Sequence, residues 1–232
     1  ALFYADNHRL EFIWTIIPVI VLAALIIYGL FTWSDIMYVD EDEDPLVIEL
    51  YAYQFDWRAR YSGKDNTLGK ANVRLIEGVN QLGVDTSDPN AQDDKVVNEL
   101  HLPLGRKVLF KMRSQDVLHS AYMPHFRAQM NCVPGMITEF SYTPTKTTAE
   151  MRMNPDVVAK VDRINKIRFE KSQKLIAKGE ESLEPYQFDY LLLCAKICGT
   201  SHYNMQMKIV VDTEKDYNKW ISSQDAFASI MQ

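Results

Sequence analysis

Residues 12–33 form a long uncharged stretch, and this stretch restricts the possible folds of the chain more than any other feature. It reads FIWTIIPVIVLAALIIYGLFTW. A helix of about 20 apolar residues spans the hydrocarbon core of a bilayer, which is roughly 30 Å thick. Trp14, Tyr28 and Trp33 suit the two membrane interfaces, and a membrane helix tolerates a proline such as Pro18. The sequence therefore predicts a membrane-spanning helix. The alternative, a buried helix of a soluble core, is disfavoured by an uncharged run of this length.

The flanks of this stretch indicate its orientation. His8 and Arg9 precede it, and the acidic run DEDED, Asp40–Asp44, follows it. Because positively charged flanks stay on the cytoplasmic side, residues from about Asp40 onward are predicted to lie on the outer side of the membrane. The chain starts at Ala1 without a signal-peptide pattern, so we expect a processed N-terminus or a longer parent chain.

Beyond Pro45 the pattern changes to β-structure. This change predicts a mainly β domain at 40–232, after the membrane helix and its flanks at 1–39. Short alternating segments, rich in β-branched and aromatic residues and separated by polar turns, are typical of a β-sandwich. The predicted strands are Leu46–Tyr53, Val96–Leu102, Lys107–Arg113, Met136–Tyr142, Thr147–Met153, Phe188–Leu193 and Met207–Val211.

Two insertions interrupt the predicted strands. Residues 62–94 are polar and rich in Gly, Asn and Asp, which predicts a long surface insertion. Residues 154–179 predict an inserted helix, because Asn154 can cap it, Pro155 suits its first turn and Gly179 can end it. Its apolar side chains are expected to pack on the sandwich or on a partner: Val158, Val161, Ile164, Ile167, Phe169 and Ile176. A further helix is predicted at 214–230.

The net charge and the cysteine count narrow the function classes. The formal net charge of −6 argues against a nucleic-acid-binding protein, which would present Lys and Arg to phosphate. It is compatible with a basic protein partner attracted by long-range charge. Three cysteines are an odd number, which argues against a disulfide framework.

The segment 194–205, CAKICGTSHYNM, gathers the side chains that point to chemistry. Thiolate, imidazole and thioether are ligands that select copper over calcium or magnesium. Cys194 and Cys198 could bridge two coppers, each capped by an imidazole, and His202 and Met205 lie close by in sequence. Such a site needs a second histidine. His119, in DVLHSAYMP, is the best candidate, because it is expected to follow a strand and precede a turn.

Two other interpretations of this segment stay open. Cys194 and Cys198 could form a disulfide in an oxidising compartment. A Cys₂His₂ zinc site is also conceivable, although zinc has no use for Met205 and the spacing is not that of a zinc finger. His202 and Met205 at tight spacing favour copper over both. His101 and His125 are expected at the surface or in packing, and Cys132 as a small buried residue.

The motifs as a set resemble subunit II of the haem-copper cytochrome c oxidases, which holds the binuclear copper A centre. The resemblance implies a cupredoxin-like Greek-key β-sandwich with an N-terminal transmembrane helix, and it covers most of the chain. It is carried by LEFIWTIIP, YQFDW, DVLHSAYMP, NCVPGM, CAKICGTSHYNM and KDYNKW.

The resemblance implies a function in respiration. The copper A centre would accept electrons from a cytochrome c-type donor and pass them to haem in a catalytic subunit that reduces oxygen to water and pumps protons. The implied partners are catalytic subunit I, other oxidase subunits, the donor, the lipid membrane and a larger respiratory supercomplex. The implied location is a bacterial inner (cell) membrane, with the copper domain on the periplasmic side, rather than the mitochondrial inner membrane.

The resemblance also implies a role for each matching residue. Cys194 and Cys198 would bridge the two coppers, and His119 and His202 would each bind one. Met205 and the main-chain oxygen of Lys196 would be weak ligands. Asp116 matches an acidic position near the donor docking surface. Glu11 matches the carboxylate at the mouth of a proton-uptake channel.

The sequence departs from the family pattern in several places. Lys196 replaces the usual Glu that also binds magnesium at the subunit interface, and a protonated Lys cannot bind a hard cation, so that magnesium is in doubt. Phe55 stands where the family has the Trp that receives the electron, so the electron route is expected to use Phe55, Trp57, Tyr53 or another contact.

The family has two membrane helices, and the span here resembles the second. The insertions at 62–94 and 154–179 lie outside the usual plan and are expected to dock a different donor or complex.

Three rival functions fit these motifs less well. A quinol oxidase subunit II keeps the fold, lacks the copper and acts structurally, but the retained Cys, His and Met residues argue against it. The membrane helix and Glu11 argue against a nitrous oxide reductase. A disulfide-stapled binding module is the third rival.

Overall fold

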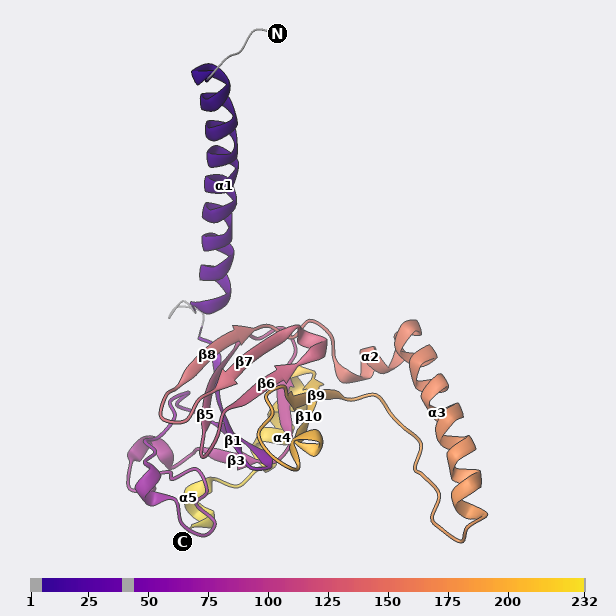
Figure 1. Cartoon of the computed structure of the whole chain (residues 1–232). Helices are drawn as coiled ribbons and strands as arrows, with labels where there is room; N and C mark the ends of the chain where they lie inside the picture. Colours follow the sequence, from indigo (N-terminus) through magenta and orange to yellow (C-terminus); the bar gives the residue numbers. More distant parts are fainter. Residues whose placement is uncertain (1–5, 39–43, 232) are drawn as a thin grey trace.

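The computed structural model describes residues 6–38 and 44–231. Helix α1, His8–Met37, projects away from the rest of the chain, and only its last turn approaches the β-domain (Figure 1). It begins where the Asn7 side chain accepts a hydrogen bond from the main-chain N–H of Leu10, and none of its residues is buried. It is long and apolar enough to cross a membrane. A buried core helix, the alternative interpretation of this stretch, is therefore wrong.

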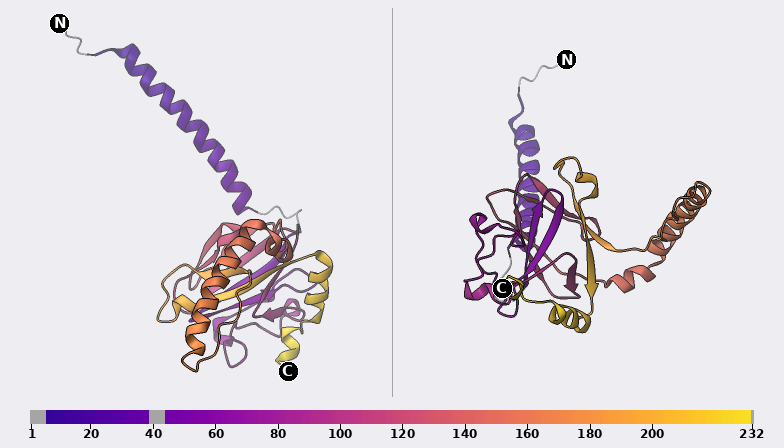
Figure 2. Two further views of the ribbon diagram at one scale, coloured as in Figure 1. Left: turned by 90° about the vertical axis from the view of Figure 1, so that its right-hand side faces the viewer. Right: turned by 90° about the horizontal axis from the view of Figure 1, so that it is seen from below.

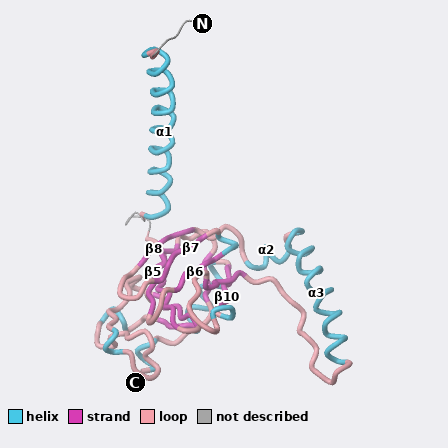
Figure 3. The backbone as a smooth tube through the Cα atoms, in the orientation of Figure 1, coloured by secondary structure: helices cyan, strands magenta, loops and turns pink. Residues whose placement is uncertain are grey.

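Within residues 44–231, ten strands form two packed sheets of five (Figures 1 and 3). The first sheet has the order β3-β2-β1-β5-β8 and the second β4-β10-β9-β6-β7. Two pairs are parallel, β1 with β5 and β10 with β4, and the other pairs are antiparallel. The bounds are β1 Leu46–Tyr53, β2 Asp56–Tyr61, β3 Lys95–Val97, β4 Leu100–Pro103, β5 Val108–Ser114, β6 His119–Met123, β7 Ala128–Cys132, β8 Thr138–Tyr142, β9 Tyr190–Cys194 and β10 Gln206–Asp212.

The core lies between the sheets because the strands alternate as the sequence pattern predicts. Along β5, every second side chain is buried. The largest fully buried side chains include Trp57, Phe110 and Leu192, which come from both sheets. The architecture is a mainly β, cupredoxin-like sandwich.

One predicted strand is wrong. Residues 147–153 form helix α2, Thr148–Met153, because Thr147 and Glu150 make a reciprocal capping box: each side chain accepts from the other residue's main-chain N–H. Helix α2 leads directly into the inserted helix α3, Pro155–Ile176. The sequence did not predict strands β2, β6 and β7, and the single strand predicted at 96–102 is two short strands, β3 and β4, in different sheets. The predicted C-terminal helix is two, α4 Glu214–Ser223 and α5 Phe227–Ile230.

The segment 62–94 has no strand of three residues or more, and buried charge holds it to the first sheet. It contains two short 3-10 turns, Val73–Leu75 and Pro89–Ala91. Arg60 on β2 donates to Glu49 on β1 at 2.5 Å and to Asp94 at 3.1 Å. Arg113 on β5 is a second partner of Glu49. Most of the acidic run 40–44 lies outside the described residues.

Candidate metal centre

Strand pairing brings the two predicted ligand segments together. In the second sheet β6 runs antiparallel to β9, with Ala121 opposite Cys194. The N–H of Ala195 donates to the carbonyl of Ser120 (3.0 Å), and the N–H of Cys194 donates to the carbonyl of Met205 (3.1 Å). The loop 195–205 is thereby folded back over the first residue of β6. That residue is His119, which begins a strand and does not precede a turn as the sequence suggested.

The predicted ligand atoms meet at short distances. Cys194 Sγ lies 3.8 Å from His119 Nδ1, 3.9 Å from Cys198 Sγ and 3.2 Å from the carbonyl oxygen of Lys196. Cys198 Sγ lies 3.6 Å from His202 Nδ1 and 3.8 Å from Met205 Sδ. The two sulfurs therefore lie at the centre, with one imidazole nitrogen beside each. We call this group of six residues the ligand cluster.

The chemistry and spacing of the ligand cluster fit a metal centre. A disulfide needs an S–S distance of about 2.05 Å, so Cys194 and Cys198 are unbridged thiols. Metal–sulfur bonds are about 2.3 Å long, so one metal can bridge two sulfurs that are 3.9 Å apart. Burial shields the cluster: His119, Cys198 and Met205 are at most 5% exposed. Burial, together with the Cys194 thiol, raises the pKa of Cys198 to about 11.

Asp116 and Gln54 are not ligands themselves but form hydrogen bonds to members of the ligand cluster. Asp116 Oδ1 lies 2.9 Å from His119 Nε2, the ring nitrogen that faces away from the sulfurs. Asp116 Oδ2 accepts from the main-chain N–H of Gln54 (2.7 Å), and Gln54 Nε2 donates to the carbonyl of Cys198 (2.6 Å). One chain of hydrogen bonds thus joins His119, on β6, to Cys198 in the loop 195–205. The resemblance implies a docking role for Asp116; within the domain both its carboxylate oxygens already accept or share hydrogen bonds. The role of Gln54 was missed, although it belongs to the YQFDW motif.

The three residues proposed for electron transfer lie at different depths. Trp57 is fully buried, and its ring meets that of His119 edge-on at 6.3 Å between centroids. Phe55 is half-buried, and its ring lies against Gly199 of the ligand loop, where a Cβ would clash. Tyr53 is half-buried, and its hydroxyl donates to Asp56. Phe55 and Tyr53 are therefore accessible from the surface, and Trp57 is not.

The other residues that the sequence singled out lie outside the cluster. Glu11 is in the first turn of α1, beside His8. The rings of His101 and Trp220 stack, and His125 packs against Phe188, as expected for packing residues. Cys132 is fully buried. The side chain of Lys196 is exposed.

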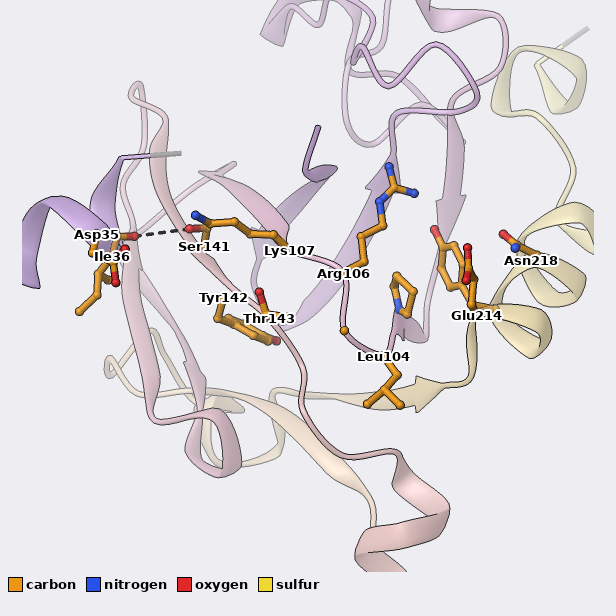
Figure 4. Close-up of a pocket in the computed structure, with 13 residues that line it drawn as sticks. Asp35, Ile36, Leu104, Arg106, Lys107, Ser141, Tyr142, Thr143, Glu214 and Asn218 are labelled. Atoms are coloured by element: carbon orange, nitrogen blue, oxygen red, sulfur yellow. Dashed lines mark hydrogen bonds between the residues drawn. The ribbon is translucent and has the colours of Figure 1, made fainter. Parts of the chain in front are cut away.

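A cavity of about 830 Å³ lies where α1 approaches the sandwich, and it contains none of the ligand cluster. Asp35 and Ile36 line it from α1, and Glu214 and Asn218 line it from α4 (Figure 4). Ser141 Oγ donates to the carbonyl of Ile36 at 3.5 Å, which ties β8 to the end of α1. The candidate metal centre is therefore the ligand cluster and not this cavity.

The fold and the ligand cluster together define a class of protein. It is a cupredoxin-like β-sandwich joined to an apolar helix, with thiol, imidazole and thioether groups gathered between two strands.

Comparison with known proteins agrees with this class. Residues 46–150 match the family described as cytochrome C oxidase subunit II, periplasmic domain. The alternative cytochrome c oxidase subunit 2 of Bradyrhizobium diazoefficiens is 33% identical over 99% of this chain and 69% of its own length. Cytochrome c oxidase subunit 2 of Alkalihalophilus pseudofirmus is 24% identical over 95% of this chain and 46% of its own length. The chain belongs to the cytochrome c oxidase subunit 2 family.

Among solved structures, the chain resembles the periplasmic domain of subunit II of cytochrome oxidase of Bradyrhizobium japonicum. The identity is 16% and the TM-score 0.44, over 77% of this chain and 91% of that one. A heme-copper terminal oxidase dimer matches with 14% identity and a TM-score of 0.44, over 89% of this chain and all of that one.

Proposed function

We propose that this chain is the electron-accepting subunit of a respiratory terminal oxidase. One observation carries the proposal: two thiols, two imidazole nitrogens and a thioether from two distant chain segments meet within contact distance. A pair of coppers bound there would supply a one-electron redox couple shared between two metals. Electrons would come from a cytochrome c-type donor and pass to haem in catalytic subunit I, which reduces oxygen to water and pumps protons.

Each member of the ligand cluster has its own role in this proposal. Cys194 and Cys198 would bridge the two coppers, His119 and His202 would each hold one, and Met205 and the Lys196 carbonyl would be weak ligands that adjust the potential. Asp116 fixes which nitrogen of His119 faces the metal, because it bonds the other. Lys196 offers no carboxylate to magnesium, so a magnesium site at the subunit interface would need ligands from elsewhere.

The surface around the cluster supports electron acceptance from a docked partner. Ile197 and Tyr203, next in sequence to the ligands Cys198 and His202, are 87% and 88% exposed. Val117 and Leu118, beside His119, are also exposed. Exposed apolar groups next to a buried redox centre are typical of a docking surface. Phe55 lies against Gly199 of the ligand loop, whereas Tyr53 packs against a separate buried group around Tyr51 and Phe227; these two are the surface contacts proposed for electron transfer.

Membrane position follows from α1 and from the family. We propose that α1 spans a bacterial inner membrane, with the sandwich on the periplasmic side and Glu11 near the cytoplasmic side, at the mouth of a proton channel. The other partners would be further oxidase subunits and a respiratory supercomplex.

Metal content and spectroscopy test the proposal. The purified oxidase should contain two coppers assigned to this chain, and its electron paramagnetic resonance spectrum should show one electron shared by two copper nuclei. Cys198→Ser should abolish that spectrum. A copper content below one per chain would instead favour the copper-free structural subunit of a quinol oxidase.

A further inference from the structure

The cavity of about 830 Å³ between α1 and the sandwich lies outside the ligand cluster and has no part in the proposed function. Cavities that bind small molecules usually have volumes of roughly 300–1,000 Å³. Four parts of the chain build this one: the end of α1, the turn between β4 and β5, the end of β8 and the start of α4 (Figure 4). It is therefore large enough for a small polar ligand.

The α1 side of the cavity lies at the depth of phospholipid headgroups in a membrane that α1 crosses. The uncharged stretch of α1 ends at Trp33, and the first residue of α1 that lines the cavity is Asp35. A helix rises 1.5 Å per residue, so Asp35 is about 3 Å beyond the apolar stretch. The headgroup layer extends roughly 5–7 Å beyond the hydrocarbon core. A headgroup can therefore enter the cavity directly from the bilayer.

Charged side chains of both signs line the cavity. Asp35 stands on one side and Glu214 on the other, with Lys107 and Arg106 between them (Figure 4). Neither Asp35 nor Glu214 forms an ion pair with another residue of 6–38 and 44–231. The lining therefore offers two positive charges in the middle and a carboxylate at each side.

Arg106 is well placed to bind a phosphate. Its ion pair with Asp44 is 3.7 Å long, and the two side chains are 43% and 81% exposed. Exposed ion pairs of this kind contribute little to stability, so Arg106 can exchange Asp44 for another anion. A guanidinium binds a phosphate through two parallel hydrogen bonds, which a long pair with one carboxylate oxygen does not provide.

We propose that this cavity binds the headgroup of a phospholipid that carries a primary amine, such as phosphatidylethanolamine. Arg106 and Lys107 would hold its phosphate, and its ammonium would donate hydrogen bonds to Asp35 or Glu214. Ile36, which is 50% exposed, would contact the apolar part of the lipid. The proposal rests on the membrane position proposed for α1 and is independent of the copper centre.

Other ligands match the charges of the cavity less well. A free phosphate, or a headgroup that has a phosphate but no amine, would satisfy the two cations and leave Asp35 and Glu214 near an added negative charge. A choline headgroup carries a positive charge, but it has no N–H group to donate to a carboxylate. A primary amine on a phosphate therefore fits both kinds of charge.

Lipid titration of the purified intact oxidase tests the proposal. The oxidase is stripped of lipid in detergent and titrated with phosphatidylethanolamine, phosphatidylglycerol or phosphatidylcholine, and native mass spectrometry counts the bound lipids. We expect a site that prefers phosphatidylethanolamine. Arg106→Gln should weaken binding at this site about tenfold or more, because it removes charge-assisted hydrogen bonds. The double variant Asp35→Asn/Glu214→Gln should lose the preference for phosphatidylethanolamine over phosphatidylglycerol.

Arg74→Gln and Glu77→Gln are the matched controls, because both residues are exposed on the segment 62–94 and lie outside the cavity. Both should bind lipid like the unmodified oxidase. All variants should keep the copper spectrum, so failure of this proposal is distinguishable from failure of the copper assignment. Equal lipid binding by the unmodified oxidase and Arg106→Gln would overturn the proposal. Equal affinities for phosphatidylethanolamine and phosphatidylglycerol would overturn it too, as would binding of soluble glycerophosphoethanolamine as tight as that of the lipid.

A photo-reactive phenylalanine analogue at position 218, in the native membrane, identifies the natural occupant. Asn218 is exposed and lines the cavity from α4, so the analogue can be accommodated there. We expect a cross-linked product with the mass of an amine-bearing phospholipid, which Arg106→Gln suppresses. Cross-linking only to another protein subunit would contradict the proposal, and so would the absence of any product.

Discussion

The side-chain amide of Gln54 donates a hydrogen bond to the carbonyl oxygen of Cys198 at 2.6 Å, across 144 residues of chain. The same residue donates its main-chain N–H to Asp116, which in turn bonds His119. Gln54 therefore positions the loop that carries Cys198 and, through Asp116, the His119 ring beside Cys194.

Replacing Gln54 tests this positioning role. Gln54→Met keeps the size of the side chain but removes the donor to Cys198. Groups behind metal ligands typically contribute 10- to 100-fold to metal affinity, so we expect a loss of about that size in copper affinity. Competition with a copper chelator measures it. Gln173→Met, on the exposed side of α3, is the control, and equal losses in both variants would contradict the role.

Asp116→Asn tests whether Asp116 acts on the metal site or on the donor. Burial raises the pKa of Asp116, but hydrogen bonds from His119, Gln54 and Val117 outweigh it and leave the pKa below its ordinary value. The carboxylate is therefore charged and stabilises positive charge near His119. Without this negative charge, the more positive oxidised site should be less stable relative to the reduced site. Potentiometry should therefore show a higher reduction potential. A changed donor affinity at an unchanged potential would instead indicate a docking residue.

Met205→Leu should leave copper bound and shift the reduction potential. Leucine has a volume similar to methionine and is tolerated in a core, but it offers no sulfur. Met205 is 2% exposed and contacts only one of the two central sulfurs, Cys198, in the described ligand cluster. Metal analysis and redox titration measure the outcome. Complete loss of copper would show that Met205 holds the metal rather than tunes it.

Copper binding should release protons and strengthen as pH rises. With a pKa of about 11, the Cys198 thiol is protonated at neutral pH in the metal-free protein. Copper binds the thiolate, so binding displaces this proton, and the affinity should rise roughly tenfold per pH unit for each proton displaced. Apparent affinities between pH 6.5 and 8.5 measure the slope. A slope of zero would mean that the thiol is already ionised before the metal binds.

Arg60→Met should destabilise the domain by about 3–5 kcal/mol, because it leaves the buried Asp94 carboxylate without its cation and leaves Glu49 with Arg113 alone. The side chains of Arg60, Glu49 and Asp94 are each at most 3% exposed. Denaturant unfolding of the metal-free protein measures the loss. Arg58→Met, which breaks the more exposed pair with Asp56, is the matched control and should cost at most about 1 kcal/mol. A similar loss in both variants would argue against a special role of the buried group.

The sequence by itself determined the features that depend on neighbouring residues. The uncharged run at 12–33 makes a helix with no buried residue, and the alternation in 46–53 and 107–113 makes strands, because local periodicity fixes which face is apolar. The segment 194–205 likewise displayed its ligand types at short spacing. In contrast, the strand predicted at 147–153 was wrong, because a two-residue capping box outweighed the β-propensity of the segment.

Only the tertiary structure decided how distant segments meet. The pairing of β6 with β9 brings His119 to Cys194, and the depth of Trp57 removes it from the surface. Asp116 and Gln54 turn inward to the ligand cluster. No local pattern encodes these relationships, because each depends on the register between strands that are far apart in the sequence and on which surfaces the packed sheets leave free.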